Sequence, residues 1–176
     1  AVRVHDRAGE PFAELSGDRV HFAPASSALR ILDRHTGDVR DATSADFVEY
    51  ARVAGRLENI AYLSTAFVPK DIPEDISDGW RLYLALATST RPVVSGAFTA
   101  DGVERMARMM SWFRDGREDL AARPFSIFTC CPSTPLRWSE DAIQKLLDCA
   151  EWGIPIEVVP VLLLGMISPS TTVGAL

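Results

Sequence analysis

The chain has 176 residues, 47% of them hydrophobic, and carries a formal net charge of −6 at pH 7. This length and apolar fraction suffice for one domain with a buried core. The acidic balance and the lack of a basic run argue against a nucleic-acid partner. No apolar run reaches the roughly 18 to 20 residues of a membrane helix, and charged residues interrupt the start, where a signal peptide would be apolar. The three cysteines form no disulfide framework, so the sequence predicts a cytoplasmic protein.

The first part of the chain, residues 1–58, is predicted to be an arm, a small antiparallel β meander and a helix. Residues 1–18 show no sustained period and are expected to be irregular. Between 20 and 42 apolar and polar residues alternate, and Gly37 lies in a polar turn, which favours the meander. Thr43 or Ser44 caps the following helix, whose apolar stripe consists of Phe47, Tyr50, Ala51, Ala54 and Leu57.

From residue 59 onward, apolar runs alternate with amphipathic stretches. Strands are expected at 60–67, 92–98, 125–131 and 156–162, and helices at 80–88, 101–113 and 138–152. This α/β order is typical of right-handed βαβ crossovers in a parallel sheet. A (β/α)₈ TIM barrel needs roughly 250 residues, so residues 59–176 are interpreted as its first half, with four strands. The open edges of such a half barrel favour a homo-oligomer.

The loops that follow the third and fourth strands are the expected site, because barrel enzymes keep their chemistry at the carboxyl ends of the strands. Cys130 and Cys131 are adjacent in a strand and point to opposite faces, so at most one of them faces the site. Burial as a small hydrophobic side chain is the alternative interpretation for either. The candidate substrate-binding residues of these strands and loops are Thr129, Cys130, Ser133, Thr134, Gly165, Met166 and Thr171, with Ser95 on the second strand.

Glu157 interrupts the apolar fourth strand, where a carboxylate is costly unless it is paired or faces a polar space. Two interpretations stay open. Glu157 either anchors a ligand in the barrel lumen or forms a structural ion pair with an arginine such as Arg91 or Arg123. Four aromatic residues could likewise form a cage for a quaternary ammonium group or pack in the core: Phe67, Phe98, Trp138 and Trp152.

Several segments resemble a known family. Residues 43–60, which begin Thr43-Ser-Ala-Asp-Phe, resemble the segment that leads into the barrel of the trimethylamine:corrinoid methyltransferase family, and residues 31–40 look like its meander. Gly153-Ile-Pro-Ile-Glu-Val-Val-Pro-Val, followed by Gly165 and Ser168-Pro169, resembles its most recognisable internal motif. The chain departs from the family at Met166, Ile167 and Ser170, which replace smaller or more apolar residues and would reshape the site.

The resemblance implies a barrel that moves a methyl group from a methylated amine, either trimethylamine or a betaine, to the cobalt of a separate corrinoid protein. The corrinoid would be carried by that partner, and no cofactor would be bound directly by this chain. Members that use trimethylamine carry pyrrolysine, at a position beyond residue 176, so the sequence leaves the amine open. On this interpretation Glu157 and the two loops line the methyl-transfer pocket, and no catalytic residue is assigned.

Two alternatives remain. A zinc-dependent corrinoid methyltransferase would need a cluster of histidines and cysteines, but His5, His21 and His35 all precede the predicted barrel and show no metal-ligand spacing. A non-catalytic half barrel could act as an assembly partner. The start without methionine and the stop inside a predicted helix favour a fragment of a longer protein instead.

Overall fold

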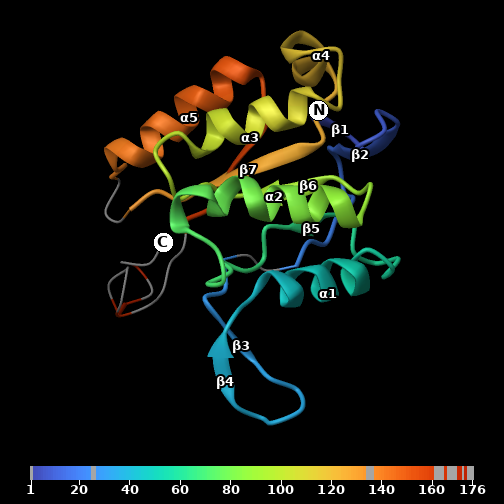
Figure 1. Ribbon diagram of the computed structural model, residues 1–176. Helices are drawn as coiled ribbons and strands as arrows, with labels where there is room; N and C mark the ends of the chain where they lie inside the picture. The colour runs from blue at the N-terminus through green and yellow to red at the C-terminus, as the bar shows by residue number, and fades with distance from the viewer. Residues whose placement is uncertain are drawn as a thin grey trace.

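The computed structural model describes residues 2–24, 27–133, 137–160, 165, 170–171 and 173. It begins with an antiparallel hairpin of β1 (Val2–His5) and β2 (Pro11–Leu15), drawn in dark blue in Figure 1. The expectation of an irregular arm at residues 1–18 is therefore wrong. Only Val4, His5 and Ala13 of this hairpin are buried, so its sequence lacks the repeated alternation by which a half-buried strand is recognised.

A second antiparallel hairpin, β3 (Arg30–Leu32) and β4 (Val39–Asp41), projects away from the sheet (Figure 1). Its presence confirms the antiparallel pairing predicted for this region. Gly37 lies in the connecting turn with φ +77°, a conformation that glycine adopts without steric cost. Residues 20–23, at the start of the predicted meander, do not form a strand of it, and Phe22 makes only an isolated parallel bridge with Ile60.

Helix α1 (Ser44–Ala54) begins as the sequence predicts. The Thr43 side chain accepts a hydrogen bond from the Asp46 backbone N–H, and the Asp46 carboxylate in turn accepts from the Thr43 backbone. This reciprocal cap satisfies two amides that the first turn of a helix leaves without partners. The buried face contains Phe47, Ala51 and Ala54, whereas Leu57 follows the end of the helix and is exposed.

The centre of the molecule is a four-stranded sheet in the order β5-β6-β7-β8, and all neighbouring strands are parallel. This confirms the predicted parallel crossovers. The arrangement is compatible with part of a barrel, although the described residues form an open sheet. The fourth strand was predicted at 156–162, and pairing ends at Val158, while residues 161–162 lie outside the described part of the chain. The strands are β5 (Leu63–Ser64), β6 (Val93–Ser95), β7 (Ser126–Cys130) and β8 (Ile156–Val158).

Three helices connect these strands, at the positions that the apolar periodicity predicts. Two shorter helical segments were not predicted: the 3₁₀ turn η1 (Glu74–Ile76) and helix α4 (Arg117–Ala122). Each has at most one buried residue, so neither carries a readable apolar stripe. The connecting helices are α2 (Ser77–Thr88), α3 (Gly102–Ser111) and α5 (Glu140–Trp152).

The two faces of the sheet bury different partners. Alternate strand residues such as Leu63, Val93 and Phe128 belong to the large core beneath the helices. Residues of the opposite parity face the other way, where Ile127 packs with Val4 of the first hairpin in a smaller cluster. The β1–β2 hairpin therefore lies against the face that would line the lumen if the sheet closed into a barrel.

Candidate functional site

Thr129 and Glu157 are paired across neighbouring strands near the carboxyl end of the sheet. Both have the parity of Ile127, so they lie on the face opposite the helices. The Thr129 hydroxyl donates a short hydrogen bond to Oε1 of Glu157. Parallel register thus brings together two polar residues that are 28 positions apart in the chain.

The arginines suggested as ion-pair partners of Glu157 are engaged elsewhere. Arg123 forms an ion pair with Asp119, and Arg91 donates to the carbonyl of Leu57 at 2.9 Å. Within the described part of the chain, Glu157 is thus held by a hydroxyl group and by no cation. A half-buried carboxylate with no cation partner attracts a positively charged ligand more strongly than one that faces bulk water.

A groove of about 440 Å³ runs along the same face of the sheet, and Glu157 is one of its lining residues. Val94 and Ile127 form part of its apolar wall. Tyr62 and His21 also line it and meet edge to face, with ring centroids 6.1 Å apart. The groove therefore combines a carboxylate, an apolar wall and two aromatic rings, and Arg19 adds one cation to its lining.

Two buried polar atoms in this groove, the Tyr62 hydroxyl and Nε2 of His21, find no hydrogen-bond partner in the described residues. Burial raises the pKa of Tyr62, so this hydroxyl stays protonated. Sequence reasoning missed both residues. Tyr62 lies next to Leu63 in the predicted first strand. Because successive strand residues point to opposite faces of a sheet, this position could have indicated that Tyr62 faces away from the core that contains Leu63. His21 comes from a segment without periodicity.

Ser95 and Cys130, two of the predicted site residues, lie on the other side of the sheet. The hydroxyls of Ser95 and Ser126 are 3.0 Å apart, and both side chains have the parity of the helix-facing core. The Cys130 thiol donates to the carbonyl of Ala142 on α5, and burial raises its pKa. Cys131 follows the end of β7 and is exposed, whereas the structure gives Cys130 the surroundings of a core residue.

The remaining candidates belong to the segments that follow β7 and β8. Ser133 exchanges two backbone hydrogen bonds with Arg137, at 2.7 and 2.9 Å. Gly165 has φ +77°, and Thr171 is exposed. Thr134 and Met166 lie outside the described residues. The four aromatic residues do not assemble into a cage: Phe67 packs in the core, Phe98 lies over Arg81, Trp152 over Arg117, and Trp138 is partly exposed.

A buried ion pair fastens the loops after β5 and β6. Arg81 is completely buried and donates to the carbonyl of Thr65 at 3.1 Å and to that of Gly96 at 2.9 Å. The same guanidinium lies 2.6 Å from the Asp78 carboxylate and 4.9 Å from the Phe98 ring centre. An Asp and an Arg three positions apart on a helix are typical of a surface pair, so their spacing does not reveal this role.

Asp78 extends the same contact to the second loop. Its Oδ2 accepts hydrogen bonds from the backbone amides of Phe98 and Thr99, both at 2.8 Å, and from the Thr99 hydroxyl. Burial by itself would raise the pKa of Asp78, but these hydrogen bonds and Arg81 hold it below its usual value. The first residues of α2 therefore determine where two loops at the carboxyl ends of the strands lie.

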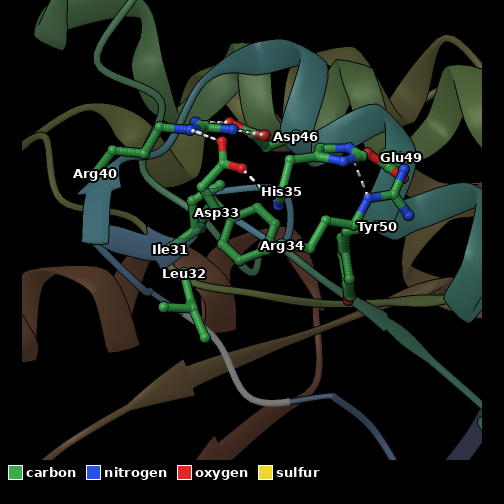
Figure 2. Close-up of a pocket in the computed structure, with 10 residues that line it drawn as sticks. Ile31, Leu32, Asp33, Arg34, His35, Arg40, Asp46, Glu49 and Tyr50 are labelled. Carbon is green, nitrogen blue, oxygen red and sulfur yellow. Dashed lines mark hydrogen bonds and ion pairs between the residues drawn. The ribbon is translucent and has the colours of Figure 1, made fainter. Parts of the chain in front are cut away.

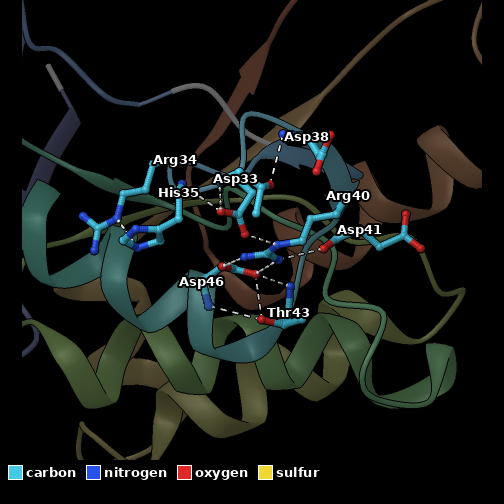
Figure 3. A network of polar contacts seen from close by, with 9 residues as sticks. Asp33, Arg34, His35, Asp38, Arg40, Asp41, Thr43 and Asp46 are labelled. Carbon is cyan, nitrogen blue, oxygen red and sulfur yellow. Dashed lines mark hydrogen bonds and ion pairs between the residues drawn. The ribbon is translucent and has the colours of Figure 1, made fainter.

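A second pocket, of about 240 Å³, lies between the β3–β4 hairpin and α1 (Figure 2). Its charged residues are largely satisfied by one another. Arg40 contacts both carboxylate oxygens of Asp46 at 2.8 Å, and its Nε lies 2.8 Å from Asp33 (Figure 3). Arg34 forms an ion pair with Glu49 at 2.9 Å. We interpret these contacts as the clamp that orients the hairpin.

The described residues contain no group of three or more His, Cys, Asp or Glu side chains placed to hold a metal ion. None of their helices is both long enough and apolar enough to cross a membrane.

Comparison with known proteins identifies relatives along the whole chain. The profile of the trimethylamine methyltransferase (MTTB) family matches residues 2–176. A glycine betaine methyltransferase of Desulfitobacterium hafniense is 25% identical over 98% of this chain and 36% of its own length. The trimethylamine methyltransferases MttB of the same species and of Methanosarcina barkeri are 22% and 24% identical, over 92% and 91% of this chain and 33% of their own lengths. The chain thus spans about a third of the length of these relatives.

Proposed function

The chain belongs to the trimethylamine methyltransferase family, and on this premise we propose that it forms part of an enzyme that moves a methyl group from a methylated amine to the cobalt of a corrinoid protein. The observation that carries the proposal is the family match over residues 2–176. Relatives named for trimethylamine and for glycine betaine both match, so the proposed donor is either trimethylamine or a betaine.

We assign Glu157 the role of binding the methylated donor through its carboxylate. A quaternary ammonium group has no proton to share, so it is bound by charge and by contact with its methyl groups. Glu157 supplies the charge, and the apolar and aromatic wall of the neighbouring groove supplies contact surface. Thr129 orients the carboxylate through its hydrogen bond.

In the reaction that we propose, the carbon–nitrogen bond of the donor breaks and its electron pair stays on nitrogen. The methyl group would pass to reduced cobalt, Co(I), of the partner protein, which would supply the electron pair of the new bond. A quaternary donor has no proton to transfer, and the proton of a protonated trimethylamine stays on the dimethylamine that leaves. Glu157 therefore acts as a binding group and not as a general base. The contribution of the protein is to hold donor and acceptor in line, which lowers the barrier by positioning.

The proposal is tested with the full-length enzyme, a reduced corrinoid partner protein and a panel of methylamines and betaines, by following methylcobalt formation spectroscopically. We expect transfer from at least one donor. Absence of transfer across the whole panel would contradict the proposed reaction.

The role of Glu157 is tested by Glu157→Gln in the same enzyme. We expect the affinity for the cationic donor to fall about tenfold or more, equivalent to roughly 1.4 kcal/mol, with the melting temperature unchanged. Glu118→Gln, an exposed glutamate of α4, is the matched control and should leave affinity unchanged. A large loss of stability with normal affinity for the donor would show instead that Glu157 has a structural role.

A further inference from the structure

The β3–β4 hairpin presents an outer face that no described part of the chain covers. Cross-strand pairs in register share a face, and Arg30↔Asp41 and Leu32↔Val39 are such pairs. Leu32 is 68% exposed and Val39 60% exposed. The Arg30 and Asp41 side chains are 70% and 65% exposed and lie 3.7 Å apart. We call Arg30, Leu32, Val39 and Asp41 the outer face of the hairpin.

The inner face of the same hairpin is fixed to the body. Ile31 and Arg40 form the remaining cross-strand pair. Arg40 connects the hairpin to α1 through Asp46 and to the turn of the hairpin itself through Asp33. In Figure 2 the Leu32 side chain points away from this contact. A two-stranded hairpin is marginally stable by itself, so the clamp holds the outer face in one orientation, as a preorganised surface requires.

The outer face is complementary to itself. It carries one cation and one anion on one cross-strand pair and two apolar side chains on the next. A two-fold axis parallel to the strands would lay β3 over β4 of a second copy. Arg30 would then face Asp41 of the copy, Asp41 would face Arg30 of the copy, and Leu32 would face Val39. Such an isologous contact needs a patch that matches itself, and this patch does.

We propose that the outer face of the β3–β4 hairpin docks onto the same face of a second copy of this chain. Four side chains are far fewer than the roughly 20 to 30 residues per side of a standard interface, so the contact by itself is weak, with a dissociation constant in the micromolar range or above. It gives the assembly its register and two-fold symmetry. The contact is independent of the proposed methyl transfer.

The test measures self-association of the purified chain by sedimentation velocity over a range of concentrations. Arg30→Glu places two negative charges on the outer face, and Asp41→Arg places two positive charges there. We expect each variant alone to associate at least tenfold more weakly than the original chain. An equimolar mixture of the two variants should associate as well as the original chain, because opposite charges then meet across the two-fold axis.

Recovery in the mixture can come only from contacts between copies, since neither variant regains its internal Arg30–Asp41 pair. The matched control uses the other hairpin, where Arg3 and Glu14 form an equivalent exposed cross-strand pair at 3.6 Å. Arg3→Glu and Glu14→Arg should leave association unchanged. If the outer-face variants prove unfolded by circular dichroism, Leu32→Ser and Val39→Thr replace them, and each should weaken association.

Three results would overturn the proposal. They are no concentration-dependent association of the original chain, a mixture that associates no better than the single variants, and control variants that weaken association equally. If a different partner or a later segment of a longer chain occupies this face, association of the original chain will be insensitive to both charge reversals, which also contradicts the proposal.

Discussion

The two β-hairpins of this chain are similar in size, but different kinds of interaction hold them to the rest of the molecule. The β1–β2 hairpin packs Val4 and Ala13 against the sheet, and Arg114 donates to the carbonyls of Asp6 and Arg7 in its turn, at 2.8 and 2.7 Å. The β3–β4 hairpin exposes its apolar pair and is joined to α1 by two ion pairs, Arg40–Asp46 and Arg34–Glu49. One hairpin is thus fixed by burial and neutral acceptors, and the other by charge.

This difference predicts how each hairpin responds to mutation and to acid. Burial and hydrogen bonds to backbone carbonyls are insensitive to the charge of the partner and to salt, whereas exposed ion pairs are weakened by salt and by protonation.

The largest expected effect is that of Arg114→Ala. The Arg114 guanidinium also donates to the carbonyl of Arg123 at 3.1 Å and lies 4.6 Å from the Phe125 ring centre. Its removal leaves several partly buried carbonyls without a donor, and we expect a loss of about 3 kcal/mol in the free energy of unfolding. Urea denaturation measures this loss. Arg108→Ala, an exposed arginine of α3, is the control and should cost less than about 0.5 kcal/mol. Equal losses would mean that Arg114 does not anchor the first hairpin.

The same substitution made in both hairpins gives the next largest effect. Val4 is completely buried and Val39 largely exposed. Val4→Ala removes two buried methyl groups and should cost about 2 kcal/mol, part of it from the cavity left behind. Val39→Ala should change stability by less than about 0.5 kcal/mol at a concentration where the chain is monomeric. Thermal or urea unfolding of the two variants decides the matter, and a cost at Val39 as large as that at Val4 would show that the second hairpin is also packed.

The smallest effect is a difference in the pH at which each hairpin loses stabilisation. Burial and the charge of Arg114 lower the pKa of His5 from its usual 6.5. The fold therefore favours neutral His5. The contribution of His5 to the free energy of unfolding is complete above pH 6.5 and declines as the pH falls below that value. Hydrogen bonds from Arg40 and from two backbone amides lower the pKa of Asp33 from 3.8 to about 2, so its contribution is complete above pH 3.8 and is lost as the pH falls toward 2.

A pH titration followed by amide NMR signals tests this order. In a His35→Asn background, which removes the histidine of the second hairpin, signals of residues 2–15 should change first, below pH 6.5, and those of residues 30–41 only below about pH 4. His5→Asn should remove the first step and leave the second. Simultaneous changes in both hairpins, in the original chain, would show that the two anchors are not independent.

The sequence was sufficient to predict an element wherever the residues of that element by themselves indicate which of its faces is buried. The cap at Thr43, the stripe through Phe47 and Ala51, and the alternation of strands and helices all predicted what forms. It also predicted that the strand with Thr129 and the strand with Glu157 would end at the same edge, because parallel crossovers require it.

The sequence was insufficient where burial depends on distant partners. The β1–β2 hairpin is stabilised by Tyr62 and Ile127, which its own residues do not reveal. Ser95 was expected at the site and faces the helices instead, because strands buried on both faces show no alternation from which to read the lumen side. The groove beside Glu157 could not be predicted either, since His21 belongs to a segment with no period.

The buried Asp78 carboxylate has a consequence for engineering. It binds two successive amides, those of Phe98 and Thr99, and a side chain at Gly102 would place its Cβ 2.6 Å from the same oxygen. The segment between β6 and α3 therefore has a fixed length, and inserted residues would pull an amide away from the carboxylate or push bulk into it. Sequence diversification of the proposed amine site at this edge of the sheet should leave residues 96–102 intact and begin in the loop between β7 and α5.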